Sequence, residues 1–145
     1  MNLRASPSEQ PLIVIDTNIV LDLFVFDDPG ARHLHKSLLT RALQWLATAP
    51  MRDELADVLE RSLIAQRLQL RGTVAADVLD QFDQHSRLLP QPCMSDLRCR
   101  DPDDQMFIDL ALAHRAMLLS KDRQVLRLRR ALLARGVVAS PLIPN

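Results

Sequence analysis

The stretch Leu12-Ile13-Val14-Ile15-Asp16-Thr17-Asn18 decides the fold class of this chain. Its four apolar residues show no polar alternation, which predicts a short strand buried on both faces. The run ends abruptly at three polar residues, and an apolar helical segment follows over about 19–24. A doubly buried strand that leads at once into a helix is typical of a parallel α/β domain.

The rest of the chain continues this alternation of short apolar strands and helices. Gly72 and Gly136 are expected to interrupt or end helices, and a turn is expected at 27–30. The expected helices lie at 31–40, 51–67, 74–88, 101–116 and 125–134, and the further strands at 43–48, 117–119 and 137–139. The pattern predicts one α/β domain over 11–145, with a parallel sheet of about four to five strands flanked by helices. Residues 1–10 are polar and predict a flexible arm.

Composition restricts the class of protein and the kinds of site. The 145 residues are 48% apolar and 25% charged, which suits one folded domain. Only 3% are aromatic, which argues against a stacking platform for single-stranded bases. Sixteen of the 18 basic residues are arginine, and 18 acidic residues balance them. Arginines could form a local surface for nucleic acid, but a neutral total does not show one.

Zinc sites, disulfides and membrane spans find no support in the sequence. Cys93 and Cys99 lack partners at zinc-ligand spacing, and His33 and His35 point in different directions on a helix. No apolar run approaches the length of a bilayer span, and the first residues lack the apolar core of a signal peptide. We therefore expect a cytoplasmic protein without a membrane segment.

Four acidic residues stand where a parallel sheet would bring them together. Asp16 follows the first strand, and Asp122 lies just beyond the 117–119 strand. Asp104 falls in the first turn of the buried helix at 101–116, and Glu54 in the first turn after the second strand. Ligands of such sheets bind beyond the carboxyl ends of the strands. The spacing thus predicts that all four carboxylates converge on one crevice.

Converging carboxylates predict a bound divalent cation. Like charges raise one another's pKa, so four close carboxylates do not all stay ionised without a positive charge among them. A hard ion with oxygen ligands, Mg²⁺ or Mn²⁺, suits such a set. One ion, or a pair about 4 Å apart, can activate water and stabilise a phosphoryl transition state.

Each acid also has a purely structural interpretation. Asp101 and Asp103 suit the start of a helix, with Pro102 at its first position, and we favour capping for both. Asp104 fits either role, and Asp122 could cap the helix that follows it. On a helical wheel Glu54 borders the apolar stripe of its helix, whereas Asp53, Asp57 and Glu60 lie opposite. Asp16 has little structural purpose at the end of a buried strand, which favours a functional role.

These segments resemble the motifs of PIN domains. Residues 13–18, ending in Asp-Thr-Asn, resemble the opening motif. Residues 52–59 are similar to the second motif, in which the Glu, here Glu54, is an acidic residue of the site. Asp-Pro-Asp-Asp at 101–104, running into the helix at 107–113, matches the third. Ser-Lys-Asp at 120–122 resembles the fourth. The resemblance covers about 12–141, and it is closest to toxin components of bacterial toxin–antitoxin pairs.

The resemblance implies a parallel α/β fold and a metal-dependent endoribonuclease acting on RNA. It places the catalytic and Mg²⁺- or Mn²⁺-binding roles on the four acids already singled out: Asp16, Glu54, Asp104 and Asp122. It also places supporting polar groups around them, on Thr17, Asn18 and Ser120. Lys121 stands where relatives often have a small residue, so it could contact phosphate or weaken metal binding. The C-terminal tail lacks the relatives' aromatic ending.

The resemblance further implies partners. A cognate antitoxin would block the crevice with a short segment carrying Arg or Lys, and the chain would pair with itself as a dimer. The segment 19–26, with Phe24 and Phe26 near a turn, is a candidate contact surface. The RNA target, the antitoxin, the number of metal ions and the oligomeric state stay open.

Three alternatives compete with this interpretation. A phosphohydrolase of haloacid-dehalogenase type needs a second Asp two residues after the first, where this chain has Asn18. A receiver domain needs an early acidic pair, which Asp16 lacks, and a Lys after a late strand, whereas Lys121 precedes Asp122. A PIN fold that acts only as a binding module would not need all four acids. We therefore rank these three below the nuclease.

Overall fold

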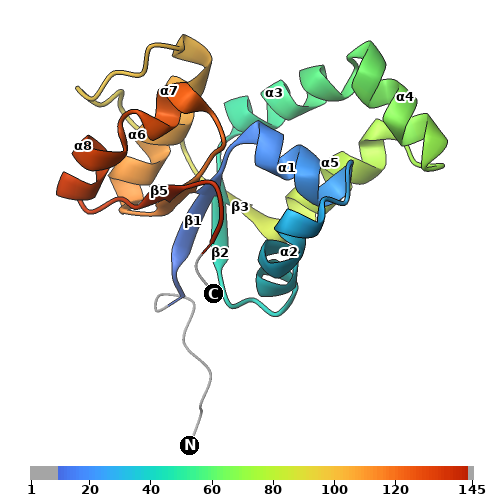
Figure 1. The fold of residues 1–145 in the computed structure, drawn as a ribbon, viewed down its shortest axis with the longest axis horizontal. Helices are drawn as coiled ribbons and strands as arrows, with labels where there is room; N and C mark the ends of the chain where they lie inside the picture. The colour runs from blue at the N-terminus through green and yellow to red at the C-terminus, as the bar shows by residue number, and fades with distance from the viewer. Residues whose placement is uncertain (1–9, 144–145) are drawn as a thin grey trace, which may run out of the picture.

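The structure is a computed structural model that describes residues 10–143 (Figure 1). Except for Gln10, the N-terminal arm predicted at 1–10 lies outside the described residues. Within 10–143 no helix is both long enough and apolar enough to cross a bilayer.

The sheet has five parallel strands in the order β3-β2-β1-β4-β5. Their bounds are β1 Leu12–Ile15, β2 Gln44–Ala47, β3 Ser86–Leu88, β4 Met117–Leu119 and β5 Ala139–Ser140. β1 is central, and its Ile15 pairs in register with Leu119 of β4. This confirms the predicted α/β class and the parallel sheet. The carboxyl ends of β1 and β4 therefore lie side by side, which positions the residues that follow them.

Helices flank the sheet in two groups. Figure 1 shows α1 to α5 on one side of β1 and α6 to α8 on the other. The bounds are α1 Thr17–Phe24, α2 Arg32–Leu39, α3 Ala49–Leu59, α4 Ser62–Leu70, α5 Ala75–His85, α6 Gln105–His114, α7 Arg123–Leu126 and α8 Arg129–Ala134, with short 3-10 turns η2 Pro29–Ala31 and η3 Pro102–Asp104. One large apolar core joins both groups through the sheet.

The core is built around β1 and α6. Ile13 and Val14 of β1 are fully buried, as the unbroken apolar run predicts. Ile108 and Leu110 of α6 are also fully buried, which confirms the expected burial of that helix. On the other side of the sheet, the Trp45 ring meets the edge of Phe82 with centroids 4.9 Å apart. Three of the five aromatic residues, Trp45, Phe82 and Phe107, are thus buried in the core.

Two helix predictions are wrong in extent. The helix expected at 51–67 is two helices, α3 and α4, separated at Glu60 and Arg61. The apolar stripe does not continue across this break, because Leu63 is 79% exposed. The helix expected at 125–134 is likewise divided into α7 and α8. Leu63 keeps the helical spacing of the apolar residues in the sequence although it is exposed in the structure, so periodicity alone does not reveal where the chain changes direction.

The predicted helix at 74–88 contains a strand that the pattern does not show. α5 ends at His85, and Ser86–Leu88 form β3, which pairs with Trp45 to Ala47 of β2. The last strand is also shifted, from 137–139 to Ala139–Ser140. Both strands are very short and gain their stability from a neighbouring strand, which is a long-range contact.

Candidate active site

Asp16 is held at the junction of β1 and β4. Its backbone N–H donates to the Leu119 carbonyl over 2.9 Å, and its side chain is only 4% exposed. The Ser120 hydroxyl donates to Asp16 Oδ2 over 2.6 Å. Burial raises the pKa of Asp16, the Ser120 bond opposes this, and the nearby Asp122 charge adds to the rise. Ser120 therefore orients a carboxylate that burial would otherwise favour in its protonated form.

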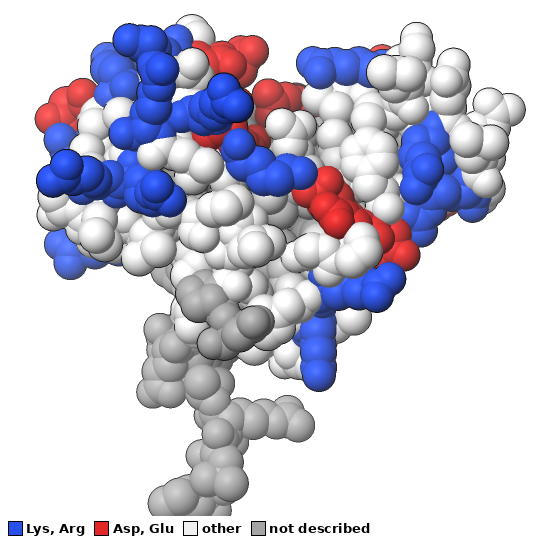
Figure 2. Space-filling model, viewed as in Figure 1, with Lys and Arg blue, Asp and Glu red and all other residues white. Residues whose placement is uncertain are grey.

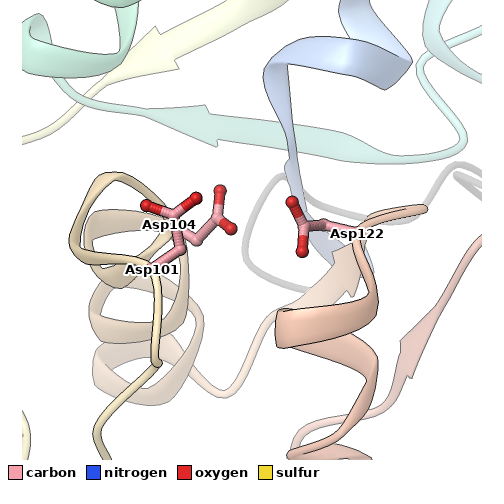
Figure 3. A group of neighbouring side chains, drawn as sticks. All are labelled: Asp101, Asp104 and Asp122. Carbon is pink, nitrogen blue, oxygen red and sulfur yellow. The ribbon is translucent and has the colours of Figure 1, made fainter.

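Three carboxylates from two segments meet beside it. One oxygen each from Asp101, Asp104 and Asp122 lies within 4.8 Å of the others. In Figure 3, Asp101 and Asp104 lie together on the segment that leads into α6, and Asp104 points toward Asp122, which precedes α7. Sequence reasoning expected Asp104 and Asp122 here, and it interpreted Asp101 only as a cap. The Asp-Pro-Asp-Asp run itself was the signal for an additional acid.

Asp101 and Asp122 combine capping with membership of this cluster. Asp101 accepts the Asp103 N–H over 3.0 Å, and Asp122 accepts the Gln124 N–H over 2.7 Å. Each of these bonds uses a single oxygen of its carboxylate. The structural and functional interpretations of these two residues are therefore compatible, since a carboxylate offers two oxygens and about four lone pairs.

Asp104 carries the strongest electrostatic signal of the site. Its side chain is 7% exposed, and its Oδ2 has no hydrogen-bond partner among residues 10–143. Burial, followed by the charges of Asp16 and Asp122, raises the pKa of Asp104 to about 8. A buried carboxylate oxygen without a partner, facing other carboxylates, matches the ligand chemistry of a hard divalent cation.

Glu54 reaches the site through Thr17. The Thr17 hydroxyl donates a hydrogen bond to Glu54 Oε2, which joins α1 to α3. Burial raises the pKa of Glu54, the Thr17 bond lowers it, and the Asp16 charge raises it again. Glu54 is therefore close enough to Asp16 for their charges to interact, although Glu54 does not belong to the group of three acids in Figure 3.

The two remaining predicted polar residues lie differently from the acids. The Asn18 side chain is exposed, and only its backbone N–H acts on Asp16, where it lowers the pKa. The Lys121 ammonium donates to Asp22 Oδ2 over 2.5 Å. Both partners of this ion pair line a cavity of about 240 Å³ beside Leu34. A phosphate contact by Lys121 stays a prediction, and it requires this ion pair to open.

Asp22 is a residue that sequence reasoning missed. It is buried within α1, and its partner comes from the segment after β4. The available signal was an acidic residue in an otherwise apolar helical stretch. Acidic residues are rarely buried without a partner, so its presence there indicates a pair.

An acidic groove of about 460 Å³ adjoins the site between α3 and η3. Asp53, Glu54 and Asp57 line one wall, Asp103 lines the other, and Arg61 is the one basic residue of this lining. The helical wheel separated Asp53 and Asp57 from Glu54. They are indeed exposed, but they share this groove with it. Asp53 and Asp57 therefore border the site, although they lie on the other side of the helical wheel from its apolar stripe.

We expect the metal-free protein to lose stability as the pH rises. The folded chain holds the Asp104 proton more tightly than the unfolded chain, because the pKa of Asp104 is raised from 3.8 to about 8. The resulting stabilisation is fully present below the pKa of the unfolded chain. It is lost as the pH rises to the pKa of the folded chain. The melting temperature in EDTA should fall by roughly 3–6 °C between about pH 5.5 and 8.5.

The Asp104→Asn variant tests this assignment. It should show a flatter pH profile and melt above the wild type at the alkaline end, because it has no charge to bury there. Asp80→Asn, at an exposed position of α5, should keep the wild-type profile. Equal slopes for wild type and Asp104→Asn would show that Asp104 does not titrate in this range.

Comparisons with known proteins agree with this architecture. A family model described as PIN domain matches residues 12–124. Among solved structures, a chain in the crystal structure of VapBC2 from Rickettsia felis, bound to a DNA fragment from their promoter, superposes with a TM-score of 0.58. The identity is 14%, and the match covers 88% of this chain and 96% of that one, which establishes a shared fold. A search of curated proteins gives no match.

Proposed function

The chain belongs to the PIN-domain family, and from this premise we propose that it is an endoribonuclease that cleaves RNA phosphodiester bonds with Mg²⁺ or Mn²⁺. The observation that carries the proposal is the buried, unpartnered oxygen of Asp104 among the carboxylates of Asp101, Asp16 and Asp122. Family membership also speaks against the haloacid-dehalogenase alternative.

Each acid has a proposed role that follows from its surroundings. Asp16, Asp104 and Asp122 would hold the metal, together with Glu54 at the edge of the site, and Asp101 adds a further carboxylate. The ion would supply an activated water and stabilise charge on the phosphate. Ser120 fixes the orientation of Asp16, and Thr17 fixes that of Glu54. Glu54 is half-buried with a raised pKa, which suits it to accept a proton from the attacking water.

We further propose that the chain is the toxin of a toxin–antitoxin pair in the cytoplasm, acting as a dimer. The sequence resemblance to such toxins supports this role, and the VapBC2 complex has a chain of the same fold. The acidic groove between α3 and η3 supports a cationic partner, since it presents four carboxylates and one arginine. An antitoxin segment carrying Arg or Lys would neutralise this field.

A metal titration tests the nuclease with two readouts. Millimolar Mn²⁺ or Mg²⁺ should raise the melting temperature of EDTA-treated protein, because the ion binds the native site and relieves carboxylate repulsion. A free ion at about 100 times its dissociation constant adds about 2.7 kcal/mol to the free energy of unfolding. The same titration should switch on RNA cleavage, followed by gel electrophoresis.

Asp122→Asn gives the matched comparison. Its melting temperature should respond less to metal, because one ligand has lost its charge. If the melting temperature of the wild type does not change when metal is added, the acidic cluster is not a metal site. A clear thermal response without RNA cleavage would favour the remaining alternative, a PIN fold that binds but does not cut.

A further inference from the structure

We propose that an arginine surface beside the carboxylate cluster binds the phosphate backbone of the RNA, an inference that rests on the proposed nuclease function. We name it the C-terminal arginine surface, and it comprises Arg98, Arg100, Arg123, Arg127, Arg129 and Arg130. All six side chains are exposed. Figure 2 shows basic side chains gathered over α7, α8 and the segment before η3, on one side of the molecule.

The arginines of this surface are not held in ion pairs within the part of the chain that the structure describes. Within residues 10–143 none of these six arginines forms an ion pair; the three pairs in that range involve Arg52, Lys121 and Arg135. Guanidinium groups bind phosphate oxygens through two parallel N–H bonds, which makes unpaired arginines effective phosphate ligands.

Two of the arginines directly adjoin the acids of the cluster. Arg100 precedes Asp101, and Arg123 follows Asp122. Asp101 and Asp122 belong to the same acidic cluster but come from different segments, so each of the two segments that form the cluster carries an arginine next to its acid in the chain. Arg127 lies four residues after Arg123, which places it on the same side of that helical turn. A strand bound along α7 would therefore carry its phosphates to the carboxylates.

The opposite side of the site repels phosphate. The groove between α3 and η3 contains Asp53, Glu54, Asp57 and Asp103 against Arg61 alone. The phosphates of an RNA are therefore expected on the C-terminal arginine surface and not in this groove. With 3% aromatic residues, contacts would fall on phosphate and not on stacked bases, so binding should depend strongly on salt and little on sequence.

The test measures binding of a fluorescent single-stranded RNA by anisotropy in EDTA, over about 50 to 200 mM KCl. The triple variant Arg100→Gln, Arg123→Gln, Arg127→Gln should bind at least about tenfold more weakly than the wild type. Its slope of log affinity against log salt should fall by about 2, the value for three lost phosphate contacts on a single strand.

The matched control removes the same charge elsewhere. Arg32→Gln, Arg41→Gln, Arg87→Gln changes three exposed arginines of α2, the turn before β2 and β3, and it should bind within about twofold of the wild type. Melting temperatures of both triple variants establish that the fold is intact. An equal loss in both variants, or no loss in the first, would overturn the proposal. A loss confined to duplex DNA, measured in parallel, would also overturn it.

Failure of this surface and failure of the nuclease assignment are distinguishable. If wild type binds RNA through these arginines but does not cleave it with Mn²⁺, the surface stands and the nuclease proposal fails. If the triple variant cleaves RNA with an unchanged KM, the nuclease stands and the surface is wrong.

Discussion

The Asp16→Asn variant is expected to lose metal-dependent RNA cleavage by at least about a hundredfold, because a metal ligand matters more than the supporting groups whose loss costs 10–100-fold. Asparagine keeps the size of the side chain, and its carbonyl oxygen can still accept the Ser120 hydroxyl bond seen at Asp16 Oδ2. The substitution removes the charge and exchanges one carboxylate oxygen for an amide NH₂ group. Gel assays with Mn²⁺ and with Mg²⁺ measure the loss.

The fold of this variant should be intact. Asp16 is a buried acid whose pKa burial raises, so neutralising it removes an unfavourable charge from the metal-free protein. We expect a melting temperature in EDTA equal to or above that of the wild type. Stability that is kept while activity is lost separates a role in the reaction from a role in folding.

Asp80→Asn is the control for this experiment, since Asp80 is exposed on α5. It should cleave RNA within about twofold of the wild type, as surface substitutions are usually nearly silent. Cleavage by Asp16→Asn at close to the wild-type rate would remove Asp16 from the site. The nuclease proposal would then have to rest on the three acids of Figure 3 alone.

Expression in a bacterial host is expected to slow growth when the wild-type chain is induced. The physical basis is the same site: an active ribonuclease degrades RNA that the host needs. Induction of Asp16→Asn to the same protein level should leave growth unchanged. The measurement is the growth rate after induction, with protein levels compared by immunoblot.

Co-expression of a small protein encoded beside this gene should restore growth. Such an antitoxin would place a cationic side chain in the groove between α3 and η3 and neutralise its carboxylates. It should co-purify with the wild type, and Asp53→Asn together with Asp57→Asn should weaken the complex. Harmless overexpression without a co-purifying partner would end the toxin proposal. The nuclease proposal would survive, because it depends on the carboxylates and not on the partner.

The sequence by itself determined the central strand and the edge of the sheet at which the acidic residues meet. The unbroken apolar run before Asp16 predicts a doubly buried strand, and β1 is central to the sheet. Parallel strands align their carboxyl ends, so the residues after β1 and β4 had to share one edge. The proximity of Asp16 to Asp122 therefore followed from the order of the elements, and the short PIN motifs selected Asp104 and Glu54.

Tertiary structure alone decided features that depend on long-range contacts. Ser86–Leu88 become a strand only because the edge of β2 accepts them, and the pairing of Asp22 with Lys121 joins residues far apart in the chain. The raised pKa of Asp104 depends on burial and on the charges of Asp16 and Asp122.

The grouping of charges on the surface is also a tertiary property. Equal numbers of acidic and basic residues give zero net charge in any arrangement, so composition carries no information about where they gather. Folding gathers acidic side chains in the groove between α3 and η3, and it gathers basic side chains over α7 and α8. The sequence thus specified which residues could hold a cation, and packing decided which surfaces face the substrate, because electrostatic interaction depends on distance in space and not on position in the chain.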